Sequence, residues 1–250
     1  MSRGRVTAYS RWRLTDYLLQ RAAIPLVLVV LFAGLPVYGT LRSRPDLFDG
    51  PQGAMFARQL FTNSIVLFLP IGVFLAATGV ISTDRQQGHF RFYFSKPVNV
   101  VAHYVQTYLL HGLVYVALFG AITWAYGAIT APQSVAAAME AAALTFVLVG
   151  GLGFLLGALT RFDGALLVLV YVLSMAAQQL VAQSTPELPP PAWLTQLARL
   201  LPPVHTLDQL RNHFYAAEAV EASQLWHVLG YGAGAFGLGM VLLRRLPLAR

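Results

Sequence analysis

Long apolar runs separated by short polar segments make up most of the chain. Six windows are continuously apolar: 22–41, 62–82, 104–127, 135–159, 165–181 and 225–243. About 20 helical residues, with about 17 to 25 tolerated, cross the roughly 30 Å of hydrocarbon in a bilayer, and each window has such a length. Strands of a membrane barrel would instead alternate between apolar and polar positions. The pattern predicts an all-α fold, a polytopic membrane protein with six transmembrane helices.

Composition agrees with this prediction. Hydrophobic residues make up 57% of the chain and charged residues only 11%, whereas an ordinary soluble domain has about 25% charged residues. Glu140 is the only formally charged residue within the six windows. The longest segment between windows, 182–224, is rich in proline and too short for a second globular domain. We expect residues 1–250 to form a single transmembrane domain.

The distribution of basic residues predicts the orientation, because Lys and Arg accumulate on the cytoplasmic side of membrane proteins. With the N-terminus inside, twelve of the 17 Lys and Arg residues fall on the cytoplasmic side and five outside. Both termini are then cytoplasmic. The chain's net charge is +7, and its basic excess borders the spans on the inner side, which suits an anionic inner leaflet and does not favour nucleic-acid binding.

Two polar segments have the spacing of amphipathic helices. In 1–21, Tyr9, Trp12 and Leu19 alternate with arginines, which predicts a short interfacial helix, with an ordered cytoplasmic lead-in as the alternative. This segment loosely imitates a signal peptide, but its long basic region and full-length apolar run predict an uncleaved first span. In the external loop 182–224, helical spacing between proline breakers predicts two short amphipathic helices that cover the span ends.

Glycine pairs with a four-residue spacing occur in two of the windows. Gly153 and Gly157 lie in the fourth window, and Gly230 and Gly234 lie in the sixth. Such spacing lets helix backbones approach closely in membranes. No internal half-repeat is evident, so a symmetric pathway would need a second copy of the chain.

The cytoplasmic bridge 83–97 joins the second and third windows. It carries an acidic-basic pair, Asp84 and Arg85, then Gly88, an aromatic run and Pro97. This order resembles the cytoplasmic coupling loop of ABC-2 type transporter permeases, the transmembrane subunits of ATP-driven exporters. The resemblance implies a homodimer, or a pair of similar subunits, docked on two copies of a separate cytoplasmic ATPase in a bacterial or archaeal inner membrane. It also implies an interfacial N-terminal helix and an exit gate in the external loop.

Several bridge residues acquire an ATPase-coupling role from this resemblance: Asp84, Arg85, Gly88, Phe90, Arg91, Phe92, Phe94 and Pro97. The aromatic side chains would anchor in an apolar groove of the partner while the charges orient at its rim. The alternative is that the aromatics form an interfacial belt and the charges are ordinary cytoplasmic flanks of the spans.

The sequence carries no nucleotide site of its own. Its single lysine, Lys96, stands between Ser95 and Pro97, so no Walker motif can be built around it. ATP and Mg²⁺ are therefore expected on the partner chain, with no cofactor bound here and no enzyme activity in this subunit. Cysteine is absent, and no histidine pair has ligand spacing beside a carboxylate, so a metal site is not predicted.

Polar residues within the spans are candidates for lining a translocation pathway: Gln106, Thr107, His111, Thr145, Ser174, Gln178 and Gln179. Each could equally bond neighbouring helices together. Two other classes of function stay open. The chain could be a membrane-embedded enzyme acting on lipid-like substrates, or a non-transporting membrane assembly protein. The sequence does not indicate the cargo.

Overall fold

The computed structural model describes residues 34–44, 50–86, 99–130, 132–185, 189–216 and 218–245, together with Thr15, Val27 and Leu31. These residues form helices and turns, without strands. Five helical stretches in this part of the chain are long and apolar enough to cross a membrane: Gly50–Asp84, Val101–Ile129, Val135–Leu159, Asp163–Ala182 and Ala222–Arg245. The chain is a multi-pass membrane protein.

These five stretches contain the five windows predicted from 62–82 onward. Most of the first predicted span, 22–41, lies outside the described residues, as does the lead-in 1–21 apart from Thr15. A helix, α3 (Leu35–Ser43), covers the end of that window and continues past it.

Helix α4 (Gly50–Ala77) begins well ahead of residue 62, where the sequence predicted its start. Ala57 and Phe61 in this early part are each 1% exposed. Tyr126 covers them, with its ring centroid 4.5 Å from that of Phe61 and its hydroxyl donating to the Ala57 carbonyl at 3.0 Å. Burial against a neighbouring helix therefore extends α4 beyond its apolar run.

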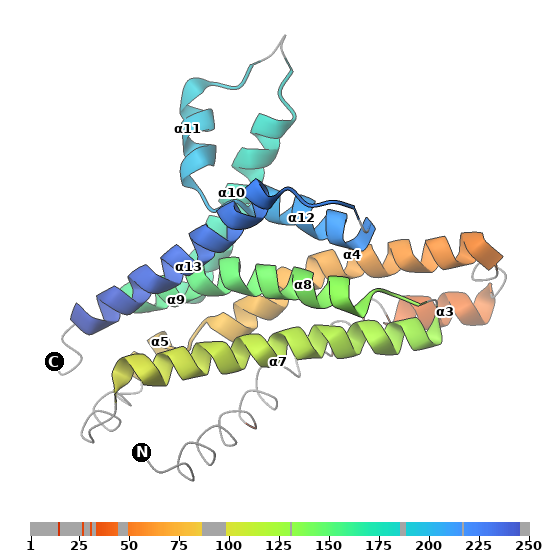
Figure 1. The fold of residues 1–250 in the computed structure, drawn as a ribbon, viewed down its shortest axis with the longest axis horizontal. Helices are drawn as coiled ribbons and strands as arrows, with labels where there is room; N and C mark the ends of the chain where they lie inside the picture. Colours follow the sequence, from red (N-terminus) through yellow and green to blue (C-terminus); the bar gives the residue numbers. More distant parts are fainter. Residues whose placement is uncertain are drawn as a thin grey trace.

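Helix α7 (Val100–Ile129) returns beside α4, and the fourth span follows it (Figure 1). Asn99 caps α7 by accepting a hydrogen bond from the Ala102 N–H at 3.2 Å. The fourth span is continuous from 135 to 159 as predicted, and consists of α8 (Val135–Thr145), the π-helical turn η4 (Phe146–Gly150) and α9 (Gly151–Leu159).

Helix α13 (Ala222–Arg245) crosses η4 and α9 at a glycine contact. A Cβ added to Gly232 would lie 2.3 Å from the Val147 carbonyl oxygen, and one added to Gly151 would lie 2.2 Å from the Gly232 carbonyl oxygen. Both distances are shorter than real Cβ contacts, so each helix needs glycine at the crossing.

The predicted roles of the two spaced glycine pairs come out differently. An added Cβ at Gly230 or Gly234 would meet no atom of another element within 4 Å, so this pair makes no close approach within the described bundle. Gly153 and Gly157 do lie in close contacts, because a Cβ added to each would lie 3.1 Å from the Ala77 Cβ and 3.3 Å from Asp163 Oδ2 respectively.

The remaining helices are α10 (Asp163–Ala182), α11 (Ala192–Leu200) and α12 (Val204–Ala216). α11 buries no residue and lies beside the upper part of α10, at the edge of the bundle in Figure 1. α12 differs, because Val204, Leu207 and Leu210 are fully buried where it packs against α8 and α10. The second loop helix is thus part of the core of the bundle, and the expectation of a cover over the span ends does not describe it.

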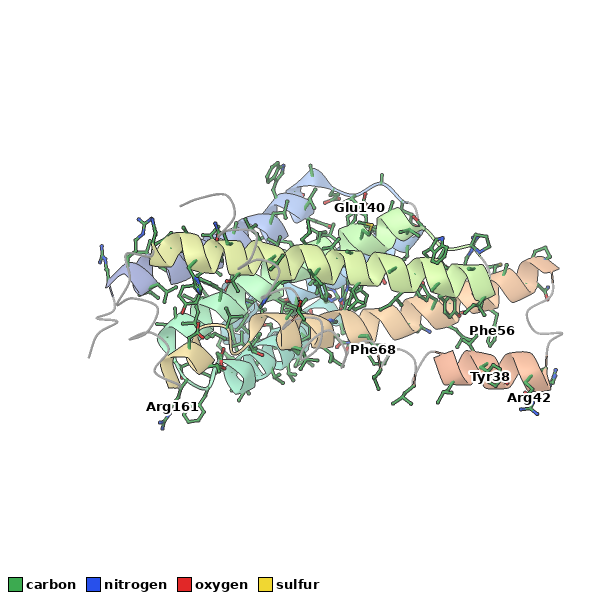
Figure 2. All side chains as sticks on the ribbon, turned by 90° about the horizontal axis from the view of Figure 1, so that it is seen from below. Tyr38, Arg42, Phe56, Phe68, Glu140 and Arg161 are labelled. Carbon is green, nitrogen blue, oxygen red and sulfur yellow. The ribbon has the colours of Figure 1, made fainter. Side chains whose placement is uncertain are left out.

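Charged residues predicted on opposite sides of the membrane lie at opposite ends of the bundle. Figure 2 shows Arg161, between α9 and α10, far from Arg42 on α3. Arg244 and Arg245 occupy the last turn of α13, whose end packs with α9 through Leu243 and Ala158. Cations there also suit the negative end of the helix dipole.

The glycine crossing predicts a position-specific loss of stability. We expect Gly232→Ala to lower the free energy of unfolding in detergent by about 2 kcal/mol or more, because the new methyl group meets backbone that cannot rotate away. The matched control is Gly234→Ala on the same helix, which should leave stability unchanged or raise it by up to about 1 kcal/mol through helix propensity. Equal effects of the two substitutions would contradict the close crossing.

Candidate functional site

Side chains of α7 donate hydrogen bonds to α4 and to the short helix α5 (Ser82–Gln86) along most of the length of α7. The donors share one face of α7, because they are separated by whole numbers of turns. They are Tyr126 to the Ala57 carbonyl at 3.0 Å, Tyr115 to the Leu69 carbonyl at 2.7 Å, the His111 Nδ1 to the Ala76 carbonyl at 2.9 Å, and Tyr104 to Asp84 Oδ2 at 3.1 Å. We call this set the α7 donor ladder.

The membrane explains why these donors bond to acceptors within the protein. A buried hydroxyl or imidazole N–H in hydrocarbon has no water to bond, so its acceptor must come from the protein. A helical carbonyl that already accepts one backbone bond has a second lone pair. The carbonyls of α4 supply acceptors in this way, and α4 and α7 are held together as a hairpin.

At the base of the bridge, Asp163 holds the turn that follows α4. Its Oδ2 accepts from the Gly79 N–H at 2.8 Å, and its Oδ1 accepts from the Ser82 hydroxyl at 2.9 Å. Gly79 has φ of 75°, a left-handed conformation that glycine adopts without a Cβ penalty. Asp163 is buried in the first turn of α10, where a carboxylate also suits the helix dipole. The clamp joins the bridge base to α10.

Asp84 makes a second contact in this region, with α7. It lies in the short helix α5 (Ser82–Gln86), is 6% exposed, and accepts the hydrogen bond from Tyr104. Arg85 follows it on α5. The side chain of Asp84 therefore packs toward α7, and does not stand at an exposed rim.

The other six residues with a predicted coupling role lie outside the described residues: Gly88, Phe90, Arg91, Phe92, Phe94 and Pro97. Their role stays a prediction from the sequence. The described residues define what flanks them: α5, in which the bridge begins, and α7, which follows it.

The polar residues proposed for the pathway fall into three groups. Thr107, Thr145 and Ser174 are buried, and each hydroxyl donates to the backbone carbonyl four residues earlier on its own helix. Gln106 and Gln179 are exposed. His111 and Gln178 bond other helices. Each of these hydrogen bonds ends on backbone, so no common polar cavity follows from them.

Gln178 ties α10 to the loop helices. Its side-chain amide nitrogen donates to the Ala198 and Pro202 carbonyls at 3.2 and 2.7 Å, and its Oε1 accepts from the His205 N–H at 2.8 Å. The amide thereby satisfies the end of α11 and the start of α12 together.

Sequence reasoning missed the most unusual polar residue, Arg211, which is 1% exposed in the core. Its Nη2 pairs with Asp208 one turn earlier on α12. The hydroxyls of Tyr171, Tyr115 and Tyr215 interact electrostatically with the guanidinium. Desolvation by burial lowers the pKa of Arg211 and raises the pKa of Tyr215, so the Tyr215 hydroxyl keeps its proton.

A signal for Arg211 was present in the sequence. Leu207, Leu210 and Phe214 define the apolar face of α12, and position 211 lies four residues after 207 on that same face. A charge on the apolar face of a helix must be buried with a partner once that face packs into the bundle.

One apolar groove of about 600 Å³ lies between α7 and the fourth span. Leu109, Leu113 and Val116 of α7 form one side, and Met139 and Phe146 form the other. None of the seven pathway candidates lines this groove. Its size suits a hydrocarbon chain more than a polar solute.

No protein-family model matches this chain, and no curated protein matches it. Within the described segments, no three His, Asp or Glu residues are grouped so that they could hold a metal ion. The resemblance to ABC-2 permeases therefore stands on the bridge pattern alone.

The Asp163 clamp predicts that this carboxylate supports the bridge base. We expect Asp163→Asn to lower the free energy of unfolding by about 1–3 kcal/mol, because the amide replaces one of two buried acceptor oxygens by a donor. Chemical denaturation in detergent measures the change. The control is Glu140→Gln, which also exchanges a carboxylate for an amide, at an exposed position on α8 (Figure 2). It should have little effect. A loss as large for Glu140→Gln would remove the special role of Asp163.

Proposed function

We propose that this chain is the permease subunit of an ABC-2 type ATP-driven exporter. It would form the translocation pathway with a second copy of itself and dock a separate cytoplasmic ATPase at the bridge 83–97. The observation that carries the proposal is the bridge itself, an acidic-basic pair, a glycine, aromatics and a proline between two spans that the α7 donor ladder holds together.

The hairpin of α4 and α7 suits the transmission of force. Separating the two helices would leave buried hydroxyl and imidazole donors without acceptors in hydrocarbon, at about 1–3 kcal/mol for each donor. A push on the bridge would therefore move α4 and α7 as one body, and would not peel one helix from the other.

A second route leads from the bridge base toward the external loop. Asp163 bonds the turn after α4 and begins α10. Gln178, near the other end of α10, bonds the start of α12. Movement of the bridge would reach α12 through this helix, which supports coupling between ATPase closure on one side and opening on the other.

Two copies of the chain are proposed because the sequence has no internal repeat. Transport proteins that alternate access commonly arrange two related halves around one pathway. In this proposal the second half is a second copy of the chain, and each copy carries one bridge, which accounts for two ATPase subunits.

The proposal is tested by purification of the chain from its native membranes in mild detergent. We expect a stoichiometric ATPase that carries a Walker motif to accompany it. After reconstitution, Phe92→Ala combined with Phe94→Ala should weaken ATPase binding by about tenfold or more, since buried aromatic anchors dominate such interfaces. The measurement is the amount of ATPase retained per chain and the ATP hydrolysis that the complex supports.

Trp124→Ala is the matched control for the two bridge substitutions. Trp124 is aromatic and 69% exposed, and it lies in the second half of α7, away from the bridge. Retention of the ATPase should be unchanged by it. An isolated chain that turns over a lipid substrate, or a partner without a nucleotide site, would replace the permease proposal with one of the two other classes.

A further inference from the structure

Arg211 places a cation at the centre of an apolar bundle. Tyr115 and Tyr171, which interact with its guanidinium, lie near the middle of α7 and α10. Phe74 of α4 stands edge-on to Tyr171, with ring centroids 5.4 Å apart. Two spans, α7 and α10, therefore meet α12 around this side chain, and α4 packs behind Tyr171. An ionisable group in such a position is a sign of function in membrane proteins, because burying a charge there is costly.

The guanidinium keeps hydrogen-bonding capacity that its neighbours do not use. It has five N–H donors, and its Nη2 pairs with Asp208. The Tyr171 hydroxyl also hydrogen-bonds to the guanidinium. Nε and Nη1 have no hydrogen-bond partner among the described residues, and neither has the Tyr215 hydroxyl. Leaving such buried donors unsatisfied costs about 1–3 kcal/mol each, and more on a charged group.

We propose that Arg211 and Tyr215 bind the acidic headgroup, phosphate or carboxylate, of an amphipathic molecule. This inference deepens the proposed function, on which it rests for the view that the molecule is cargo. The planar guanidinium presents two adjacent donors that match the oxygens of either headgroup. The Tyr215 hydroxyl adds a third donor.

The groove between α7 and the fourth span accounts for the apolar part of such a molecule. Its wall includes Phe146, whose ring centroid is 5.8 Å from that of Tyr115. Phe146 and Tyr115 thus connect the wall of this groove with the group of donors around Arg211, although Arg211 itself does not line the groove. A free inorganic anion would have no use for this groove.

Asp208 provides a means of exchange. Its side chain is 17% exposed while that of Arg211 is 1% exposed, so the carboxylate can turn toward water as an incoming anion takes its place. The buried charge of Arg211 is then balanced before and after binding. This substitution avoids the cost of an uncompensated buried cation.

The test uses the purified chain in phosphatidylcholine nanodiscs, with no ATPase present. The probes are dodecyl phosphate, dodecanoate, dodecanol and inorganic phosphate, and equilibrium dissociation constants are measured. We expect both acidic amphiphiles to bind at least about tenfold more tightly than dodecanol, as for a hydrogen-bonded charge. Inorganic phosphate should bind far more weakly. Equal binding of dodecanol, or equally tight binding of inorganic phosphate, overturns the proposal.

Substitutions test which residues cause the preference for acidic headgroups. Arg211→Gln should abolish the preference for the acidic probes, and Arg199→Gln, an exposed arginine on α11, should retain it. Tyr215→Phe should weaken the binding of the acidic probes by about threefold or more, and should leave the binding of dodecanol unchanged. Asp208→Asn should make the acidic probes bind more tightly, because it removes the competing carboxylate.

A purely structural Arg211 would give a different pattern. Stability would fall in these variants, but the ratio between acidic and neutral probes would stay as in the wild type, and the proposal would be wrong. If Arg211→Gln does not fold, Tyr215→Phe and Asp208→Asn still test the proposal, because each should change the ratio between the binding of acidic and neutral probes. Failure here leaves the permease proposal standing, since that proposal is tested by ATPase retention alone.

Discussion

A donor buried in hydrocarbon must find its acceptor in the protein, and α7 meets this requirement on the backbone of α4. Tyr126, Tyr115 and His111 bond carbonyls spread along α4, and Tyr104 bonds Asp84 beyond its end. The rest of the bundle is arranged around this hairpin. The bridge joins its two helices, α8 packs along α7, and the core fills the space between α4 and η4.

A second close contact, between Gly151 and Gly232, brings α9 and α13 within backbone distance. It lies where a π turn interrupts the fourth span, and Tyr108 donates to the Phe146 carbonyl at the start of that turn. π turns break the regular hydrogen-bond ladder and are frequent at functional positions. The bundle thus combines one pair of helices locked by side-chain bonds with another pair held by close backbone packing.

Polar residues divide by what they bond. The sequence grouped seven of them as pathway candidates on chemistry alone, because a hydroxyl or amide in a span has no visible partner in one dimension. In three dimensions Thr107, Thr145 and Ser174 bond their own helices, and Gln178 joins α10 to α12. Arg211 belongs to the external loop 182–224 in the sequence prediction, and it is a buried cation in the structure because its helix packs into the core.

The sequence predicted the helical fold class, the five spans from residue 62 onward and the bounds of the span at 135–159. Such predictions are possible because the length of an apolar run can be compared with a fixed bilayer thickness. The sequence did not predict the early start of α4, because Ala57 and Phe61 are sheltered by Tyr126, a residue far along the chain. The choice of Gly232 over Gly230 and Gly234, and the burial of α12, were likewise decided by how helices cross. Helical periodicity defines which residues share a face, but only the packed bundle determines which face meets another helix.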